Sequence, residues 1–204
     1  MNEARLLLQT EVEVEESPRT EENLIPMAKG KVVSVKRIGQ GARVCVDMRE
    51  SMKPGEGMLV GSQSAGLLLV EAQVRRNRYI EPRPFRVNAG PVSSYVLTPG
   101  MKTRYLVELR AGDEILIVNR SGVARTGHVG RVRIERTPMM VIGIEIGGRG
   151  FSTIVQDAET VGLISDTASI AIPDLKVGNV VLLRVEEGGR HFGTFVPDEM
   201  VIER

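Results

Sequence analysis

Short runs of Val, Ile and Leu, separated by glycine or proline, recur along the chain from residue 31 onwards. They follow one another at roughly 8–12 residues, a spacing that is typical of β-barrels and β-sandwiches. No apolar stripe with a helical period extends over several turns. We therefore predict a mainly β fold, with two or three small β-barrel-like lobes packed as one compact body and few short helices.

Several of these runs are expected to pair as hairpins across small-residue turns. The predicted hairpins join residues 31–38 to 42–48 through GQG, 57–63 to 66–74, and 180–187 to 190–196 through Gly188 and Gly189. Separate strands are expected at 123–136 and 138–146. The segment DAETVGLIS, residues 157–165, is predicted to form a short helical turn that begins at Asp157.

One faint repeat links three segments, residues 52–61, 109–118 and 175–185. Each has a Lys or Arg, one further residue, a Gly, an acid or Asn, and then an apolar run. This order predicts a turn whose glycine has a positive φ and which leads into a buried strand.

Charge divides the chain into an acidic leader, residues 1–22, and a β-rich domain, residues 23–204. The leader holds seven Glu and two Arg, so its charge is about −5, while the whole chain carries +1. The leader is either solvated or an element that docks on a partner chain. Residues 75–106 are irregular and rich in Pro and Arg, but their apolar side chains favour an ordered segment.

The composition narrows the class of partner. A net charge of +1, no Trp and 3% aromatic residues argue against nucleic acid. No run approaches the length of a membrane span or of a secretory signal, which favours a cytoplasmic protein. The single cysteine, Cys45, excludes an internal disulfide and is expected in the core. Many strand edges favour a homo-oligomer.

Six blocks of sequence resemble one enzyme family. They are RVCVDMRESMKPGEGMLVGSQSAGLLLVEA, RPFRVNAGPVSSYVL, PGMKTRYLVELRAGDEILIV, VGRVRIERTPM, VQDAETVGL and EEGGRHFG. Together they resemble the C-terminal part of type II, archaeal-type 3-dehydroquinate synthase and of the related 3-amino-4-hydroxybenzoate synthases. The resemblance covers residues 31–204 and does not extend to the N-terminal half of the family.

The resemblance implies an enzyme of aromatic biosynthesis that closes a linear seven-carbon 2-amino keto acid into a six-membered ring. One branch of the family deaminates the acid oxidatively with NAD to give 3-dehydroquinate. The other cyclises and dehydrates it to an aminohydroxybenzoate. The alternative is a non-catalytic or half-enzyme subunit that works with a separate α/β chain.

Ring closure needs a carboxylate-binding group, proton transfer and a group that stabilises an enolate. Arginine binds carboxylates through its planar fork. The predicted substrate-binding residues in the matched blocks are Arg86, Asn88, Arg104 and Arg190. The predicted catalytic residues are His191, Glu159, Tyr105 and Lys102.

Their expected roles follow from their chemistry. His191 can transfer protons at neutral pH, with Glu159 as a second candidate. Tyr105 can donate to an oxyanion, and Lys102 can form an imine or bind an anion. The other histidine, His128, is expected to be structural.

The candidate cofactors are NAD, which the resemblance implies, and a divalent metal, which could stabilise the enolate. The segment GQGARV begins like a dinucleotide fingerprint, but it lacks the third glycine and a strand follows it. A NAD site in this chain would therefore not be of the Rossmann type. Acidic residues could supply oxygen ligands to a metal, yet no spacing between them is diagnostic.

Overall fold

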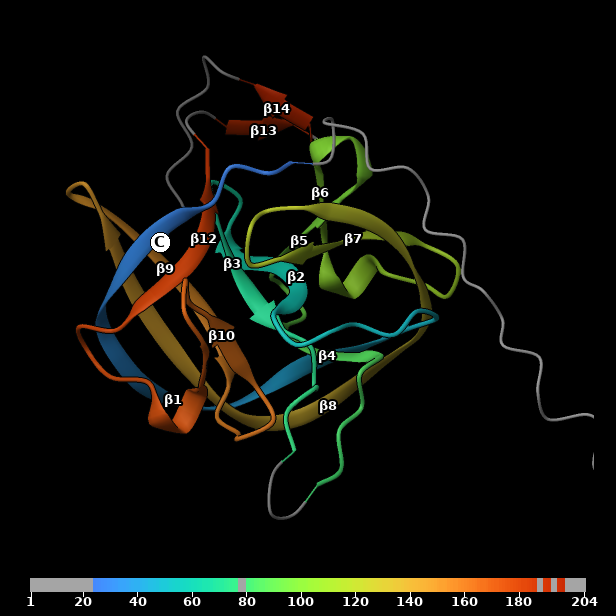
Figure 1. Ribbon diagram of the computed structural model, residues 1–204, viewed down its shortest axis with the longest axis horizontal. Coiled ribbons are helices and arrows are strands. Elements are labelled where there is room, and N and C mark those ends of the chain that lie inside the picture. The colour runs from blue at the N-terminus through green and yellow to red at the C-terminus, as the bar shows by residue number, and fades with distance from the viewer. Residues whose placement is uncertain (1–23, 77–79, 187–188, 192–193, 197–204) are drawn as a thin grey trace, which may run out of the picture.

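The computed structural model describes residues 24–76 and 80–186, and the backbone of residues 189–191 and 194–196 (Figure 1). The predicted acidic leader lies outside these residues. Strands β1 to β12 form one sheet, and β13 pairs with β14 in a second, two-stranded sheet. The prediction of a mainly β fold is confirmed, although the strands make one compact sheet and not a clean barrel. Among the described residues, no helix is long and apolar enough to cross a membrane.

The strands of the main sheet vary widely in length. Their bounds are β1 Ala28–Met48, β2 Glu56–Gln63, β3 Gly66–Glu71, β4 Arg86–Pro91, β5 Tyr95–Thr98, β6 Lys102–Tyr105, β7 Glu114–Asn119, β8 Ala124–Ile146, β9 Arg149–Gln156, β10 Gly162–Ile164, β11 Ser169–Ala171 and β12 Val180–Val185. Three 3-10 turns, Pro99–Met101, Leu106–Glu108 and Ile172–Asp174, are the helical elements in the described part. The small hairpin consists of β13 Gly189–His191 and β14 Thr194–Val196.

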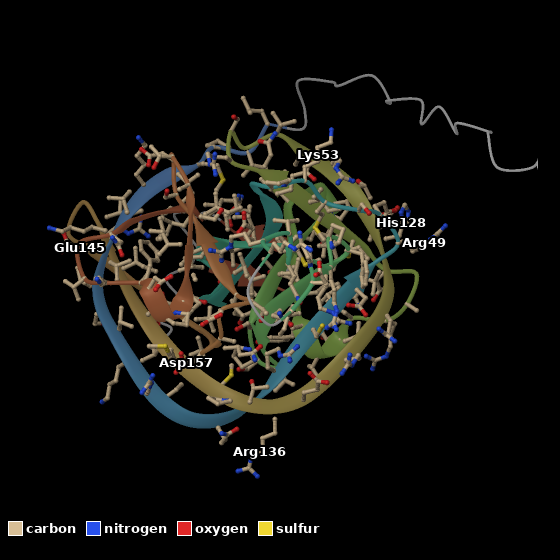
Figure 2. The ribbon with its side chains drawn as sticks, turned by 60° about the horizontal axis from the view of Figure 1, so that its bottom comes forward. Arg49, Lys53, His128, Arg136, Glu145 and Asp157 are labelled. Carbon is tan, nitrogen blue, oxygen red and sulfur yellow. The ribbon has the colours of Figure 1, made fainter. Side chains whose placement is uncertain are left out.

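Two long antiparallel strands, β1 and β8, form the frame of the molecule. They pair from Lys31 opposite Glu145 to Met48 opposite Val129. Figure 2 shows them side by side around the outside of the body, with Glu145 near one end and Arg49 and His128 near the other. The predicted hairpin at residues 39–41 is therefore wrong, and the strands predicted at 123–136 and 138–146 are one strand.

The GQG segment bends β1 without reversing it. Gly39 has a φ of 91°, and the register between β1 and β8 shifts between Arg37 and Gly39. This is a β-bulge, which inserts an extra residue and increases the local twist. Pro138 lies opposite Gln40 in the same region of the ladder. A glycine and a proline, which predicted a turn and a break, instead allow a long strand pair to curve.

The three repeated segments form the predicted turns. Gly55, Gly112 and Gly178 have φ values of 82°, 91° and 96°, and each turn leads into a strand, β2, β7 or β12. In each turn the first backbone N–H donates to the side chain three residues later. These hydrogen bonds are Lys53 to Glu56 (2.8 Å), Arg110 to Asp113 (2.6 Å) and Lys176 to Asn179 (2.7 Å).

The core lies on both faces of the β2–β3 hairpin, which forms as predicted. All six residues of β3 are buried, and alternate residues enter two separate apolar clusters. The two strands approach so closely at Gly57 that a Cβ there would lie 1.9 Å from the carbonyl oxygen of Val70. This hairpin is the inner layer around which β1, β8 and β9 wrap (Figure 1).

Two further predictions about local structure are wrong. Strand β12 pairs with β1 and β3, and β13 pairs with β14, so residues 180–187 and 190–196 do not form a hairpin with each other. Residues 157–160 form a bend and a turn and not a helix, and β10 follows directly. Strand pairing over long distances outweighs the weak local helix signal of this segment.

Candidate functional site

A cluster of charged side chains lies where β1 passes between β4 and β8. In the ladder, Asp47 is opposite Arg86 on one side and Arg131 on the other. Paired residues on adjacent strands point to the same face of a sheet. We call the polar side chains on this face the arginine cluster; its members are Arg43, Cys45, Asp47, Arg86, Asn88, Arg131, Arg133 and Glu135.

Asp47 is the central acceptor of the cluster. Its carboxylate accepts hydrogen bonds from Nε and Nη2 of Arg86, at 2.6 and 2.9 Å. From the opposite strand, Nε and Nη2 of Arg131 donate to the same carboxylate, at 3.0 and 2.5 Å. The side chains of Asp47 and Arg86 are each only 7% exposed, which makes this a buried, bidentate ion pair.

A second group of contacts centres on Arg43. Its Nη1 donates to Oδ1 of Asn88 at 2.7 Å, and its Nη2 donates to Oε2 of Glu135 at 2.6 Å. Arg133 also donates to Glu135. The Nε of Arg43 is buried and has no hydrogen-bond partner. The cluster is therefore well connected, but its donors are not fully satisfied.

The environment of the cluster shifts the pKa values of its members. Burial by itself would raise the pKa of Asp47, but hydrogen bonds from Arg86 and Arg131 outweigh it and lower the pKa to about 2. The hydrogen bond to Asp47 raises the pKa of Arg86. Burial raises the pKa of the Cys45 thiol, which is 1% exposed, so the prediction that Cys45 lies in the core is confirmed.

The turn after β9 borders the cluster. Nδ2 of Asn88 lies 3.5 Å from Oγ1 of Thr160, and the neighbouring residue, Glu159, is exposed. Asp157 at the start of this turn pairs with Nε of Arg37 at 2.9 Å. Figure 2 shows Asp157 inside the arc of β1 and β8. Three predicted residues, Arg86, Asn88 and Glu159, thus lie in one region.

The predicted residues of β6 form a second group. Arg104 donates from Nη1 to Asp113 at 2.9 Å and from Nη2 to the carbonyl oxygen of Glu108 at 2.9 Å. The ring of Tyr105 stacks on Tyr95 with centroids 4.6 Å apart, and their hydroxyl groups are 2.9 Å apart. The side chain of Lys102 is exposed.

The hairpin that carries Arg190 and His191 lies next to this second group. The backbone of strand β14 lies close in space to that of β6 (Figure 1). The side chains of Arg190 and His191 are outside the described residues, so their roles stay predictions. No hydrogen bond or ion pair between described residues joins the β6 group to the arginine cluster.

His128 lies away from both groups of candidate residues and contacts two carboxylates, those of Glu50 and Glu114. Its backbone N–H donates to Oε2 of Glu50 at 2.8 Å, and its Nδ1 lies 2.8 Å from Oε1 of the same carboxylate. Burial alone would raise the pKa of Glu50, but these two hydrogen bonds lower it. His128 thereby ties β8 to the residues that follow β1.

Sequence reasoning missed most of the arginine cluster. Arg43 and Asp47 alternate with buried Val44 and Val46, and the segment RVRIER places Arg131, Arg133 and Glu135 on one face of β8. This alternation of charged and apolar residues was visible. The sequence did not indicate which strands would bring these charged residues together.

The described residues contain no group of three or more His, Cys, Asp or Glu side chains placed to hold a metal ion. The GQG segment lies within β1, so the described part of the molecule has no helix N-terminus at that point to receive a pyrophosphate.

Comparison with known proteins gives one family. The sequence model of the 3-dehydroquinate synthase II C-terminal domain matches residues 29–204. The 3-dehydroquinate synthase of Methanobrevibacter smithii is 50% identical over 174 residues, which cover 85% of this chain and 47% of that protein. The enzymes of that name from Methanococcus aeolicus and Methanopyrus kandleri are 51% and 52% identical, with 85% of this chain and 48% and 44% of those proteins covered. The chain thus spans about half the length of these relatives, and no solved structure matches it.

Proposed function

Because the chain belongs to the 3-dehydroquinate synthase II family, whose C-terminal domain it matches, we propose that it closes a linear seven-carbon 2-amino keto acid into a six-membered ring. The observation that carries this proposal is the match over residues 29–204, which includes every block that holds a candidate residue. The proposal covers both branches of the chemistry. These are oxidative deamination to 3-dehydroquinate and cyclisation with dehydration to an aminohydroxybenzoate.

In this proposal the arginine cluster and the turn after β9 bind the acidic end of the substrate. Arg86 and Asn88 are buried in this region, and Glu159 on the exposed turn is a candidate proton carrier. A guanidinium group provides paired donors that match the two oxygens of a carboxylate. Such a contact would orient the substrate for attack of one of its carbons on another.

The β6 group and the neighbouring hairpin supply the remaining candidates. His191 transfers protons, because an imidazole exchanges protons near neutral pH. Tyr105 donates to the developing enolate oxygen, and its hydroxyl already lies 2.9 Å from that of Tyr95. Lys102, exposed on the same strand, binds an anionic group or forms an imine with a ketone. Arg104 and Arg190 are further carboxylate contacts.

The oxidative branch requires NAD, which accepts the hydride that leaves the amine-bearing carbon. The described residues provide no helix N-terminus at GQG and no metal-binding cluster. We therefore assign no residue of this chain to NAD or to a metal.

A second candidate function is that of a half-enzyme subunit. The chain would then pair with a separate α/β chain that corresponds to the remaining part of such a relative. A homo-oligomer is compatible with either function.

The decisive experiment is a turnover assay of the purified chain. The linear seven-carbon 2-amino keto acid, an amino heptulosonate, and its phosphate are each incubated with the chain alone. Both are also incubated with the chain and the remaining half of the M. smithii enzyme, added as a separate protein. Products are identified by mass spectrometry with and without NAD. NADH and 3-dehydroquinate indicate the first branch, and an aromatic amine formed without NAD indicates the second. Activity only in the mixture supports the half-enzyme, and no product under any condition refutes both functions.

The histidines offer a matched pair of variants for this assay. His191→Ala is expected to lose most turnover, whereas His128→Ala is expected to keep it, because the contacts of His128 are with Glu50 and Glu114 and not with the candidate site. Full turnover in a folded His191→Ala protein would contradict the role of His191.

A further inference from the structure

The arginine cluster contains more positive than negative charge. Two carboxylates, Asp47 and Glu135, are shared among four guanidinium groups, those of Arg43, Arg86, Arg131 and Arg133. The net charge of the cluster is therefore +2. Buried charges are normally paired, because an unpaired ion loses its hydration without compensation. The two buried arginines, Arg43 and Arg86, are each paired with a carboxylate, so the excess positive charge resides on the more exposed Arg131 and Arg133.

The four arginines differ in how far they reach solvent. The side chains of Arg43 and Arg86 are each 7% exposed, while those of Arg131 and Arg133 are 60% and 41% exposed. A ligand from solution can therefore contact the two arginines of β8 directly. The buried Arg43 on β1 and Arg86 on β4 add to the positive potential at this site.

Arg131 and Arg133 are neighbours on one face of β8. They are two residues apart on β8, so both point to the same face, with their Cβ atoms about 7 Å apart. Arg131 uses Nε and Nη2 for Asp47, and Arg133 uses Nη2 for Glu135, which leaves the Nη1 groups of both for a ligand. The contacts to Asp47 and Glu135 hold the two guanidinium groups in place before a ligand arrives.

We propose that Arg131 and Arg133 form a binding site for the carboxylate of a small molecule. The site is built from residues that none of the sequence predictions included. It rests on the proposed function only for the identity of the natural ligand, the amino keto acid. The anion binding itself follows from the charge excess and from the exposure of the two side chains.

The test is a titration of the full chain with malonate, a simple dicarboxylate, at constant ionic strength. Binding is measured by calorimetry, and the Arg side-chain Nε–Hε signals are followed by NMR. We expect saturable binding that shifts the signals of Arg131 and Arg133. Arg131→Gln and Arg133→Gln should each weaken the affinity about tenfold, the effect of losing one charge-assisted hydrogen bond. Arg131→Lys keeps the positive charge but loses the paired donors of the guanidinium group, so it should also weaken the affinity for malonate.

Arg136→Gln is the matched control. Arg136 is an exposed arginine on the same strand, it lies outside the cluster, and it points away from the body in Figure 2. This variant should change the affinity less than about twofold. Circular dichroism of each variant shows whether it is folded.

Three results would overturn the assignment: no saturable binding by the wild type, equal weakening in Arg136→Gln, or unchanged affinity in folded Arg131→Gln and Arg133→Gln proteins. A parallel titration with inorganic phosphate separates the two anion chemistries, and binding of phosphate alone would exclude a carboxylate site. Malonate binding without product under any condition of the turnover assay would refute the proposed function and leave the site intact.

Discussion

Asp47→Asn removes the carboxylate that lies between two arginines in the arginine cluster. Asn keeps the size of the side chain but loses the charge, so Arg86, which is 7% exposed, is left buried without its counter-ion. Removing one partner of a buried ion pair typically costs about 3–5 kcal/mol. We expect a loss in unfolding free energy of about 3 kcal/mol at neutral pH, because Arg131 can turn towards solvent.

The loss should depend on pH in a defined direction. The pKa of Asp47 is about 2 in the folded protein and has a reference value of 3.8. The carboxylate therefore stabilises the native state fully above about pH 4, and this stabilisation disappears as the pH falls towards 2. At about 1.4 kcal/mol per pKa unit this shift corresponds to about 2.5 kcal/mol, and screening of the exposed Arg131 by solvent lowers the expected effect to about 2 kcal/mol.

The measurement is urea unfolding, followed by circular dichroism, of wild type and variant at several pH values between neutral and about 2. The control is Glu81→Gln. Glu81 and its partner Arg76 are 77% and 78% exposed, so the control should cost less than about 1 kcal/mol. The reasoning is refuted if Asp47→Asn costs no more than the control at neutral pH. It is also refuted if the difference between wild type and Asp47→Asn does not narrow below pH 4.

Three further predictions test the core and the second group of candidate residues. Gly57→Ala should cost at least about 2 kcal/mol in thermal or urea unfolding, because the new Cβ would lie 1.9 Å from the backbone oxygen of Val70. Gly150→Ala, with no atom within 4 Å of the added Cβ, is its control, and equal losses would contradict the packing. Cys45 should react with thiol reagents far more slowly in the native protein than in urea, since it is 1% exposed and burial raises its pKa; equal rates would contradict its burial. Tyr105→Phe should lose about 1 kcal/mol of unfolding free energy or less, because it removes one hydroxyl contact and keeps the ring stack, whereas Tyr105→Ala should lose more.

Local sequence predicted the turns of this fold well. Gly55, Gly112 and Gly178 were expected to have a positive φ on the evidence of a short repeat, and all three do. The turn needs only a glycine, an acceptor side chain and a following apolar run, all within a few residues of one another. The β2–β3 hairpin was predictable for the same reason, since a small-residue turn joins its two strands.

Long-range pairing was not predictable in this way. Gly39 and Pro138 gave the signals of a turn and of a strand break, yet both lie within strands of more than 20 residues. A bulge and a turn use the same residue types, and the choice between them depends on whether a distant strand is available to pair. Here β8 pairs with β1 across the bulge, at a separation in sequence that no local pattern encodes.

The candidate site shows the same division. The alternation of charged and apolar residues in RVCVD and RVRIER by itself determined that one face of each strand is polar, because side chains alternate along a strand. The tertiary structure alone decided that Asp47 meets Arg86, 39 residues away, and Arg131, 84 residues away. A shift of one residue in either ladder would have sent these side chains to opposite faces. Register between distant strands is a property of the whole packed sheet, and so is the excess positive charge that makes this face a candidate anion site.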